Sequence, residues 1–269
     1  MKKGIYPLFV LEVIAYPWHN RCNIIGFLLL NTSLKFEFYG LSDVGLVREH
    51  NEDAWKVLSE RGISILADGM GGHNAGEIAA QTAVDTLTEL LLTTSSPMNE
   101  AFEKVNHLIY QMGEETPSLS GMGTTLIALE LQEGGQALRT HVGDSRLYLF
   151  RDGQIRALTR DHSLVNELVD LGTISLEEVE IFPYKHVLTK AIGTNPKVKP
   201  ESHFFTYLPG DIYLLCSDGL TNYATDRELE TAMRQMDSLK EGASNLIEIA
   251  KRNGGGDNVT VILVRVYNP

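Results

Sequence analysis

Three aspartates stand where an apolar run meets a glycine, and this shared placement could do chemistry. Asp68 ends the run "ISILADG", Asp218 ends "IYLLCSDG", and Asp257 lies between three glycines and the run "NVTVIL". A single Asp-Gly pair after a strand is typical of an ordinary turn. Because the ends of neighbouring strands lie about 5 Å apart, three such carboxylates can also converge on one point, where their repulsion requires a cation. Oxygen ligands suit Mg²⁺ or Mn²⁺, so the pattern indicates a divalent-metal site.

Glycines follow the first of these aspartates closely, in "DGMGGHNAG". A glycine has no Cβ, so a main-chain oxygen and a substrate can approach it closely. We therefore expect the backbone after Asp68 to form part of the site.

A second cluster, in "SDVGLVREHNEDAW", adds a positive charge. Arg48 precedes Glu52 by four residues and Asp53 by five. Arginine suits bidentate recognition of phosphate, and the two acids can hold water bound to a metal. The alternative is a surface ion pair of little energetic value.

The composition limits the partners of such a site. The chain has 269 residues, 43% of them apolar, with 23 Lys and Arg against 35 Asp and Glu, a formal charge of -12 and a pI near 5.1. This charge repels nucleic acids and anionic lipid, so neither is an expected partner. Cys22 and Cys216 are the only cysteines, which excludes a disulfide framework and fits a reducing cytoplasm.

The elements that must position these residues are strands in runs, with helices between the runs. Short apolar runs predict strands at "FEF", "GISILADG", "HVGDSRLYLF", "GDIYLLCSDG" and "VTVILVRV". Apolar residues at helical spacing predict two helices after the glycine loop, the second capped by Ser96 with Pro97 in its first turn. Further helices are predicted over residues 165–171, from the capping box at 175–178, and over residues 226–236 and 246–252. This order favours an α+β fold with one domain over residues 35–269.

Residues 1–34 differ from the rest and are predicted to be an N-terminal extension. Their two apolar patches are interrupted by charged residues and prolines, and neither approaches the roughly 20 apolar residues of a membrane-spanning helix. The open alternatives are upstream sequence outside the folded domain, an ordered peripheral element, and a weak membrane or secretion signal.

Eight stretches together resemble a known family. They are "SDVGLVREHNEDA", "LADGMGGHNAGE", "GMGTTL", "HVGDSRLYLF", "TRDHSLV", "LTKAIG", "CSDGLTN" and "GGGDNVTVIL". In this order they are similar to the motif series of the bacterial metal-dependent protein phosphatases of type 2C, and the resemblance covers residues 35–266. It implies two packed antiparallel β-sheets flanked by helices, an α-β-β-α sandwich, with a two-metal centre at one end.

The resemblance also implies metal ligands. Asp68 would bridge two Mn²⁺ or Mg²⁺ ions, and the carbonyl of Gly69 would join one of them. Asp218 and Asp257 would hold the other ion.

Three further residues receive roles in the same way. Glu52 and Asp53 would act mainly through metal-bound water, and Arg48 would hold the substrate phosphate. A water molecule bridging the metals would attack phosphorus in line, so no Ser or Cys nucleophile is needed. Cys216 is then expected to serve packing.

Asp144, in "HVGDSRLYLF", is a candidate ligand of a third and weaker ion, because some family members use the aspartate of this motif in that way. The segment from Val165 to Lys190 would be a flap over that site. The alternative is a turn aspartate that pairs with Arg146.

Other polar residues near the motifs have open roles. Met70 stands where some relatives have a histidine that acts as general acid, which leaves His73 as a candidate for that role. His141 and His162 are expected to be structural. Asn258 and the pair Thr124 and Thr125 could orient site carboxylates or satisfy local backbone.

The predicted function is that of a cytoplasmic protein-serine/threonine phosphatase that uses Mn²⁺ or Mg²⁺. Its partners would be phosphoserine and phosphothreonine proteins, including a cognate kinase. One alternative is a catalytically silent pseudophosphatase that binds phosphoproteins, although such modules usually lose a metal carboxylate. Another is a scaffold with a structural cation, against which Arg48 beside the acids argues.

Overall fold

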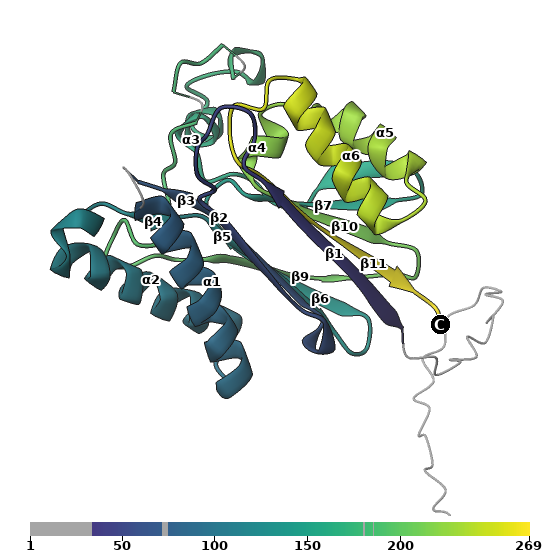
Figure 1. The fold of residues 1–269 in the computed structure, drawn as a ribbon, viewed down its shortest axis with the longest axis horizontal. Helices are drawn as coiled ribbons and strands as arrows, with labels where there is room; N and C mark the ends of the chain where they lie inside the picture. Colours follow the sequence, from purple (N-terminus) through teal and green to yellow (C-terminus); the bar gives the residue numbers. More distant parts are fainter. Residues whose placement is uncertain (1–33, 72–74, 180, 185) are drawn as a thin grey trace, which may run out of the picture. The chain divides into compact units, whose positions relative to one another are not determined.

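Two antiparallel sheets, packed face to face, form the centre of the fold (Figure 1). The structure is a computed structural model that describes residues 34–71, 75–179, 181–184 and 186–269. All of these belong to the second of two units, Met1–Thr32 and Ser33–Pro269. Residues 1–33 of the predicted extension and His73, the candidate general acid, lie outside the described residues.

Within each sheet, every pair of neighbouring strands is antiparallel. The first sheet has the order β1 (Lys35–Asp43), β11 (Val259–Tyr267), β10 (Ile212–Cys216), β7 (Arg146–Arg151) and β8 (Gln154–Ala157). The second has the order β2 (Asp53–Leu58), β3 (Ile63–Met70), β5 (Leu126–Gln132), β6 (Gln136–Val142) and β9 (Glu201–Thr206), and β4 (Gly123–Thr124) pairs with β3.

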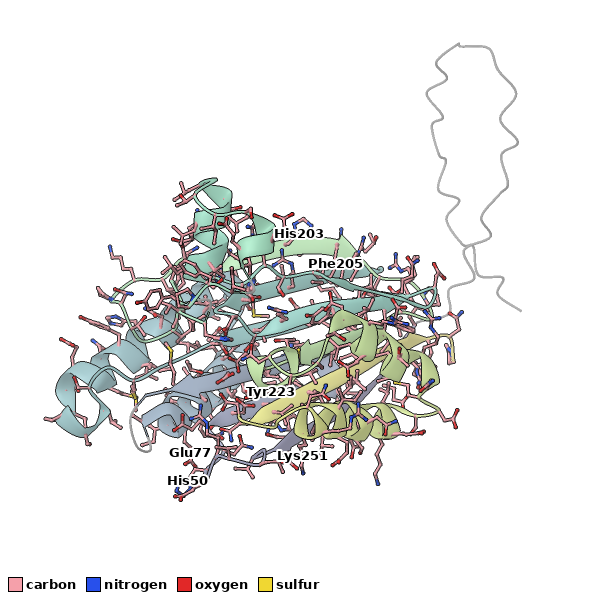
Figure 2. The ribbon with its side chains drawn as sticks, turned by 90° about the horizontal axis from the view of Figure 1, so that it is seen from above. His50, Glu77, His203, Phe205, Tyr223 and Lys251 are labelled. Carbon is pink, nitrogen blue, oxygen red and sulfur yellow. The ribbon has the colours of Figure 1, made fainter. Side chains whose placement is uncertain are left out.

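Helices cover the outer faces of both sheets. Helices α1 (Ala75–Thr93) and α2 (Met98–Glu115) pack on the second sheet, and α5 (Asp226–Gln235) and α6 (Leu239–Arg252) pack on the first. Figure 2 shows His203 of β9 and Lys251 of α6 toward opposite sides of the sandwich. Helices α3 (Leu164–Asp170) and α4 (Asp218–Thr221) are short, and the described residues also form 3₁₀ turns at Ser59–Arg61, Pro117–Leu119 and Leu176–Glu178.

The apolar pattern of the central strands explains this layering. Residues of β3 and β11 are buried on both faces, because one face of each sheet meets the other sheet and the opposite face meets helices. Between the sheets lie Leu66, Ile127, Tyr213 and Ile262. The predicted α+β sandwich is thus confirmed.

Several local predictions were wrong for identifiable reasons. The stretch "HVGDSRLYLF" is not one strand, because Gly143 (φ 106°) makes a turn between the end of β6 and the start of β7. Ser96 is not the cap of α2, whose N-cap is Pro97 without a side-chain hydrogen bond. The capping pair at residues 175–178 supports only a 3₁₀ turn. Among the described residues, no helix combines the length and apolar character needed to cross a membrane.

Candidate metal centre

Five acids from both sheets meet at one end of the sandwich. Asp53 opens β2 and lies directly opposite Asp68 of β3 in the strand register. Asp218 follows the end of β10, and Asp257 precedes the start of its antiparallel neighbour β11. Both aspartates therefore lie at the same end of the strands of the first sheet. Asp144 lies in the turn between β6 and β7.

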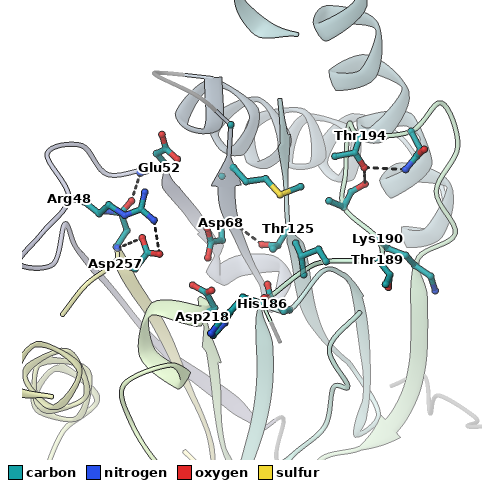
Figure 3. A pocket seen from close by; sticks show the side chains of 18 residues that line it. Arg48, Glu52, Asp68, Thr125, His186, Thr189, Lys190, Thr194, Asp218 and Asp257 are labelled. Atoms are coloured by element: carbon teal, nitrogen blue, oxygen red, sulfur yellow. Dashed lines mark hydrogen bonds and ion pairs between the residues drawn. The ribbon is translucent and has the colours of Figure 1, made fainter. Parts of the chain in front are cut away.

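These elements enclose a cavity of about 570 Å³ (Figure 3). Its lining includes the predicted site residues Arg48, Glu52, Asp68, Gly69, Asp144, Asp218 and Asp257. Asp53 does not line this cavity but lies opposite Asp68 in the strand register and binds Ser217 and Thr260. The structure therefore brings together every predicted site residue.

Ionisation is disfavoured at Asp53, Asp68, Asp144 and Asp218. Burial raises the pKa of Asp53 to about 7, although hydrogen bonds from Thr260 and Ser217 act in the opposite direction. Burial, followed by the charge of Asp218, raises the pKa of Asp144 to about 7. Burial and neighbouring carboxylates also raise the pKa of Asp68 and of Asp218. A cation among these groups would remove both penalties, that of burial and that of repulsion.

One buried oxygen supplies a direct test of whether a cation fits. Asp53 Oδ2 accepts hydrogen bonds from Ser217 Oγ (2.8 Å) and Thr260 Oγ1 (2.6 Å). Asp53 Oδ1 is inaccessible to solvent and accepts no hydrogen bond from any described residue. Because a buried carboxylate oxygen normally has a partner, this oxygen and the all-oxygen set around it fit Mg²⁺ or Mn²⁺.

Close backbone packing explains two of the glycines. A Cβ on Gly69 would lie 2.1 Å from the carbonyl oxygen of Gly76 and 2.6 Å from that of Glu52. A Cβ on Gly219 would lie 1.9 Å from the carbonyl oxygen of Asn258. Both positions bring the chain segments of the site into contact, as the glycine-rich sequence after Asp68 led us to expect.

The side chains of Thr124, Thr125 and Asn258 bind main-chain groups rather than carboxylates. Thr125 Oγ1 accepts from the Asp68 amide (2.9 Å), and Thr124 Oγ1 donates to the Asp68 carbonyl oxygen (2.9 Å). Asn258 accepts from the Glu52 amide and donates to the carbonyl oxygens of two loop residues, Val44 and His50. Of the two alternatives left open by the sequence, satisfaction of backbone is the one observed.

Arg48 finds its partner far along the chain. Its Nη2 lies 2.9 Å from Asp257 Oδ2, and half of its side chain is exposed. The spacing suggested an ion pair with Glu52 or Asp53 of its own loop, but the structure shows the pair with Asp257 instead. The guanidinium therefore faces the cavity with donors to spare.

Arg146 is not the partner of Asp144. It binds Asp161 through two hydrogen bonds of 2.9 and 2.7 Å, which leaves Asp144 toward the cavity. Cys216 is fully buried, and burial raises the pKa of its thiol to about 12, which agrees with a packing role.

Sequence reasoning missed four residues of the site. Ser217 and Thr260 orient Asp53, and their position next to the predicted acids and strand was an available signal. His186 and Lys190 also line the cavity (Figure 3). Both lie in the segment predicted to form a flap, and Lys190 belongs to the motif "LTKAIG", but neither residue was assigned a role.

A two-sheet sandwich with an acid-rich centre at one end is the arrangement that the resemblance to the type 2C phosphatases implied, and comparison with known proteins leads to the same family. The family described as Protein phosphatase 2C matches residues 47–248, and the chain belongs to this family. The predicted resemblance is thereby confirmed.

Two of the relatives are bacterial proteins. The chain is 40% identical over 235 residues to serine/threonine phosphatase stp of Listeria monocytogenes, which covers 83% of this chain and 93% of that protein. It is 39% identical over 247 residues to serine/threonine protein phosphatase PstP of Mycobacterium tuberculosis, covering 89% of this chain and 47% of that protein.

Solved structures show the same likeness. The crystal structure of Mycobacterium tuberculosis PstP/Ppp superimposes with a TM-score of 0.80 at 38% identity, covering 86% of this chain and 99% of that one. The catalytic domain of PstP in complex with two manganese ions gives a TM-score of 0.78 at 38% identity, covering 87% and 100%.

Proposed function

We propose that this chain is a protein-serine/threonine phosphatase that hydrolyses phosphomonoesters with Mn²⁺ or Mg²⁺. The observation that carries the proposal is the convergence of Asp68, Asp218 and Asp257 with Arg48 on one cavity. The relatives named as serine/threonine phosphatases, and the manganese ions bound to PstP, support it.

Each acid would have a distinct place around the metals. Asp68 would bridge two ions, the carbonyl oxygen of Gly69 would bind one, and Asp218 and Asp257 would bind the other. Glu52 and Asp53 would hold metal-bound water, and Asp144 would bind a third, weaker ion. When bound, the ions would supply Lewis acidity and lower the pKa of a water molecule that attacks phosphorus.

The chain's own residues would bind and orient the phosphate. Arg48 is half exposed at the cavity and can donate to phosphate oxygens while it stays close to Asp257. Since Asp257 would share its charge with a metal ion, its hold on Arg48 would weaken as the site fills.

Phosphoserine and phosphothreonine proteins would be the substrates, including a cognate serine/threonine kinase in the cytoplasm. The charge of -12 disfavours nucleic acids and anionic membranes as partners. Phosphosite mass spectrometry of cells with and without the protein tests this, because unchanged phosphoserine and phosphothreonine levels would contradict it.

Residues 35–269 would form the catalytic domain, and the N-terminal extension would not be part of it. Leu34 and Phe36 pack against the apolar layer between the sheets. A chain lacking residues 1–33, which keeps both, should therefore retain full activity, and a large loss would show that the extension takes part.

The central experiment measures hydrolysis by the full chain. Release of nitrophenol from p-nitrophenyl phosphate, and of phosphate from a phosphothreonine peptide, should require Mn²⁺ or Mg²⁺ and stop with a chelator. A folded wild-type protein that binds the peptide without hydrolysing it would instead be the pseudophosphatase alternative.

A further inference from the structure

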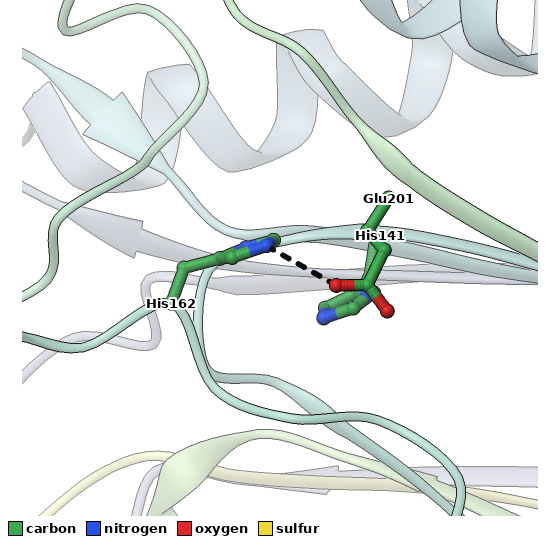
Figure 4. Close-up of side chains that lie close together, drawn as sticks. All are labelled: His141, His162 and Glu201. Carbon is green, nitrogen blue, oxygen red and sulfur yellow. Dashed lines mark ion pairs between the residues drawn. The ribbon is translucent and has the colours of Figure 1, made fainter. Parts of the chain in front are cut away.

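Two buried histidines and a glutamate meet beside the metal centre (Figure 4). His141 is the penultimate residue of β6, His162 precedes α3, and Glu201 opens β9. The imidazole rings stack with centroids 4.7 Å apart and planes 10° apart. Ligand-type atoms of the three residues lie within 4.8 Å of one another, so the cluster first suggests a second metal site.

The hydrogen bonds of the rings argue against a metal there. His162 Nδ1 accepts from the Gly143 amide (3.1 Å), so the proton of the neutral ring is on Nε2, which faces Glu201 Oε2 at 3.8 Å. His141 Nδ1 accepts from Arg139 (3.2 Å), and its Nε2 donates to the Arg160 carbonyl oxygen (3.1 Å).

No lone pair of either ring is therefore free for a cation. Arg139 adds a positive charge to the cluster and holds Glu201 Oε1 at 2.8 Å. Burial lowers the pKa of both histidines, that of His162 to about 4, which agrees with two neutral rings in these tautomers.

What the cluster does hold is the turn that carries Asp144. The His162 amide donates to the Gly143 carbonyl oxygen (3.0 Å) while the His162 ring accepts from the Gly143 amide, so Gly143 is bound through both of its main-chain groups. On the other side of Asp144, Ser145 Oγ lies 2.7 Å from Thr125 Oγ1, which also accepts from the Asp68 amide.

The same histidine joins the two ends of the segment beside the cavity. The His162 carbonyl oxygen accepts from the Thr189 amide (2.9 Å), and Ser163 forms a bridge with Leu188. Leu188 and Thr189 line the cavity of the metal centre. One residue thus contacts the Asp144 turn and the cavity wall formed by the end of this segment.

We propose that His162 is a positioning residue, whose Nδ1 fixes the Gly143 amide and so sets the position of Asp144 relative to Asp68 and to the wall at Thr189. The proposal rests on the proposed function for the role of Asp144. Its structural content, the bond from Gly143 to His162, does not depend on that function.

The test compares His162→Leu with His162→Asn. The Oδ1 atom of asparagine is placed like Nδ1 of histidine and can accept from the Gly143 amide, whereas leucine cannot. In the metal-free protein, the Gly143 amide should exchange with solvent about tenfold faster in His162→Leu than in wild type, the factor of one lost hydrogen bond, and His162→Asn should restore protection. In ¹⁵N spectra of wild type, His162 Nδ1 should be unprotonated at neutral pH.

Kinetics supply a second readout. With phosphothreonine peptide and saturating Mn²⁺, kcat of His162→Leu should fall about tenfold to a hundredfold with a smaller change in KM, and His162→Asn should recover most of it. Met233→Ala, which removes buried volume from α5 remote from the site, serves as the stability control and should retain kcat.

Four results would overturn the proposal: equal exchange in the leucine and asparagine variants, equal kcat in both, the same loss in Met233→Ala, or a cation bound to His162. Failure of the proposed function is distinguishable, because wild type would then lack metal-dependent hydrolysis while the exchange experiment still reports on His162.

Discussion

Asp53→Asn should stabilise the metal-free protein, and increasingly so as pH rises. The pKa of Asp53 is raised from its ordinary value of 3.8 to about 7, so the folded state binds this proton more tightly than the unfolded state. Between these two values, the unfolded chain has released the proton and the folded chain has not, and each rise in pH therefore favours unfolding. Asparagine carries no titrating proton and lacks this penalty.

The magnitude follows from the shift. Each pH unit within the window changes the free energy of unfolding by about 1.4 kcal/mol, so the full shift of roughly three units corresponds to about 4 kcal/mol. The variant's advantage should accordingly grow by about 3 kcal/mol between about pH 5 and about pH 7. The free energy of unfolding of a domain is usually about 5–15 kcal/mol, so this change would be a large part of it.

The comparison between variant and wild type is needed because the histidines act in the opposite direction. The pKa of His162 is lowered to about 4, so its contribution to stability rises with pH up to the ordinary value of 6.5. His141 acts in the same sense. Both contributions are present in the two proteins and cancel in the difference.

Urea unfolding followed by far-ultraviolet circular dichroism, in chelator and at several pH values, measures this difference. With saturating Mn²⁺ the sign should reverse, because the variant binds the cation less well and gains less stability from it. A difference that stays constant with pH in chelator, or that is the same in Mn²⁺, would refute the reasoning.

Four further predictions concern single residues of the site. Asp68→Asn should stay folded but lower Mn²⁺-dependent turnover at least about a hundredfold, and substantial activity would contradict the bridging role. Arg48→Ala should raise KM for a phosphopeptide about tenfold or more, while calorimetric Mn²⁺ affinity is unchanged or higher because Asp257 loses a competing cation. Asp144→Ala should keep two tightly bound ions in calorimetry and lose most peptide hydrolysis, whereas identical isotherms and full activity would make it a turn residue. Gly69→Ala should lower the free energy of unfolding by about 3 kcal/mol or more, since its Cβ would meet backbone oxygen at 2.1 Å, and an unchanged urea midpoint would contradict this packing.

The apolar runs predicted the central strands of the site well. Residues of β3, β10 and β11 are buried on both faces, so their sequences are continuous apolar runs. The first two runs end at Asp68 and at Asp218, and the third begins just after Asp257. This placement indicated that the three acids could converge. The neighbouring-strand argument holds for Asp218 and Asp257, whereas Asp68 belongs to the other sheet and meets them across the sandwich. Which sheet each strand joins was not indicated, because pairing depends on the whole chain.

Other parts of the fold left weaker signals. Strand β9 lies at the edge of its sheet and is largely exposed, so its sequence lacks an apolar run. The break between β6 and β7 depends on one glycine with φ of 106° within a run that is otherwise typical of a strand. Arg48 has a partner 209 residues away, and no local pattern indicates that contact. His186 and Lys190 lie in the predicted flap, but the sequence did not indicate which of its side chains would line the cavity.

The hydrogen-bonding pattern explains how one centre can be both rigid and open to a cation. The side chains of Thr124, Thr125 and Asn258 bind main-chain groups next to the acids, so these side chains fix the backbone without occupying carboxylate oxygens. Asp53 is held through one oxygen only, and its other oxygen is buried without a partner among the described residues. A carboxyl group held in this way binds its proton more tightly in the absence of a cation and would release it when a cation and its water molecules bind beside it. Metal affinity should therefore rise with pH across the window in which Asp53 and Asp144 titrate, while the backbone around them keeps its position.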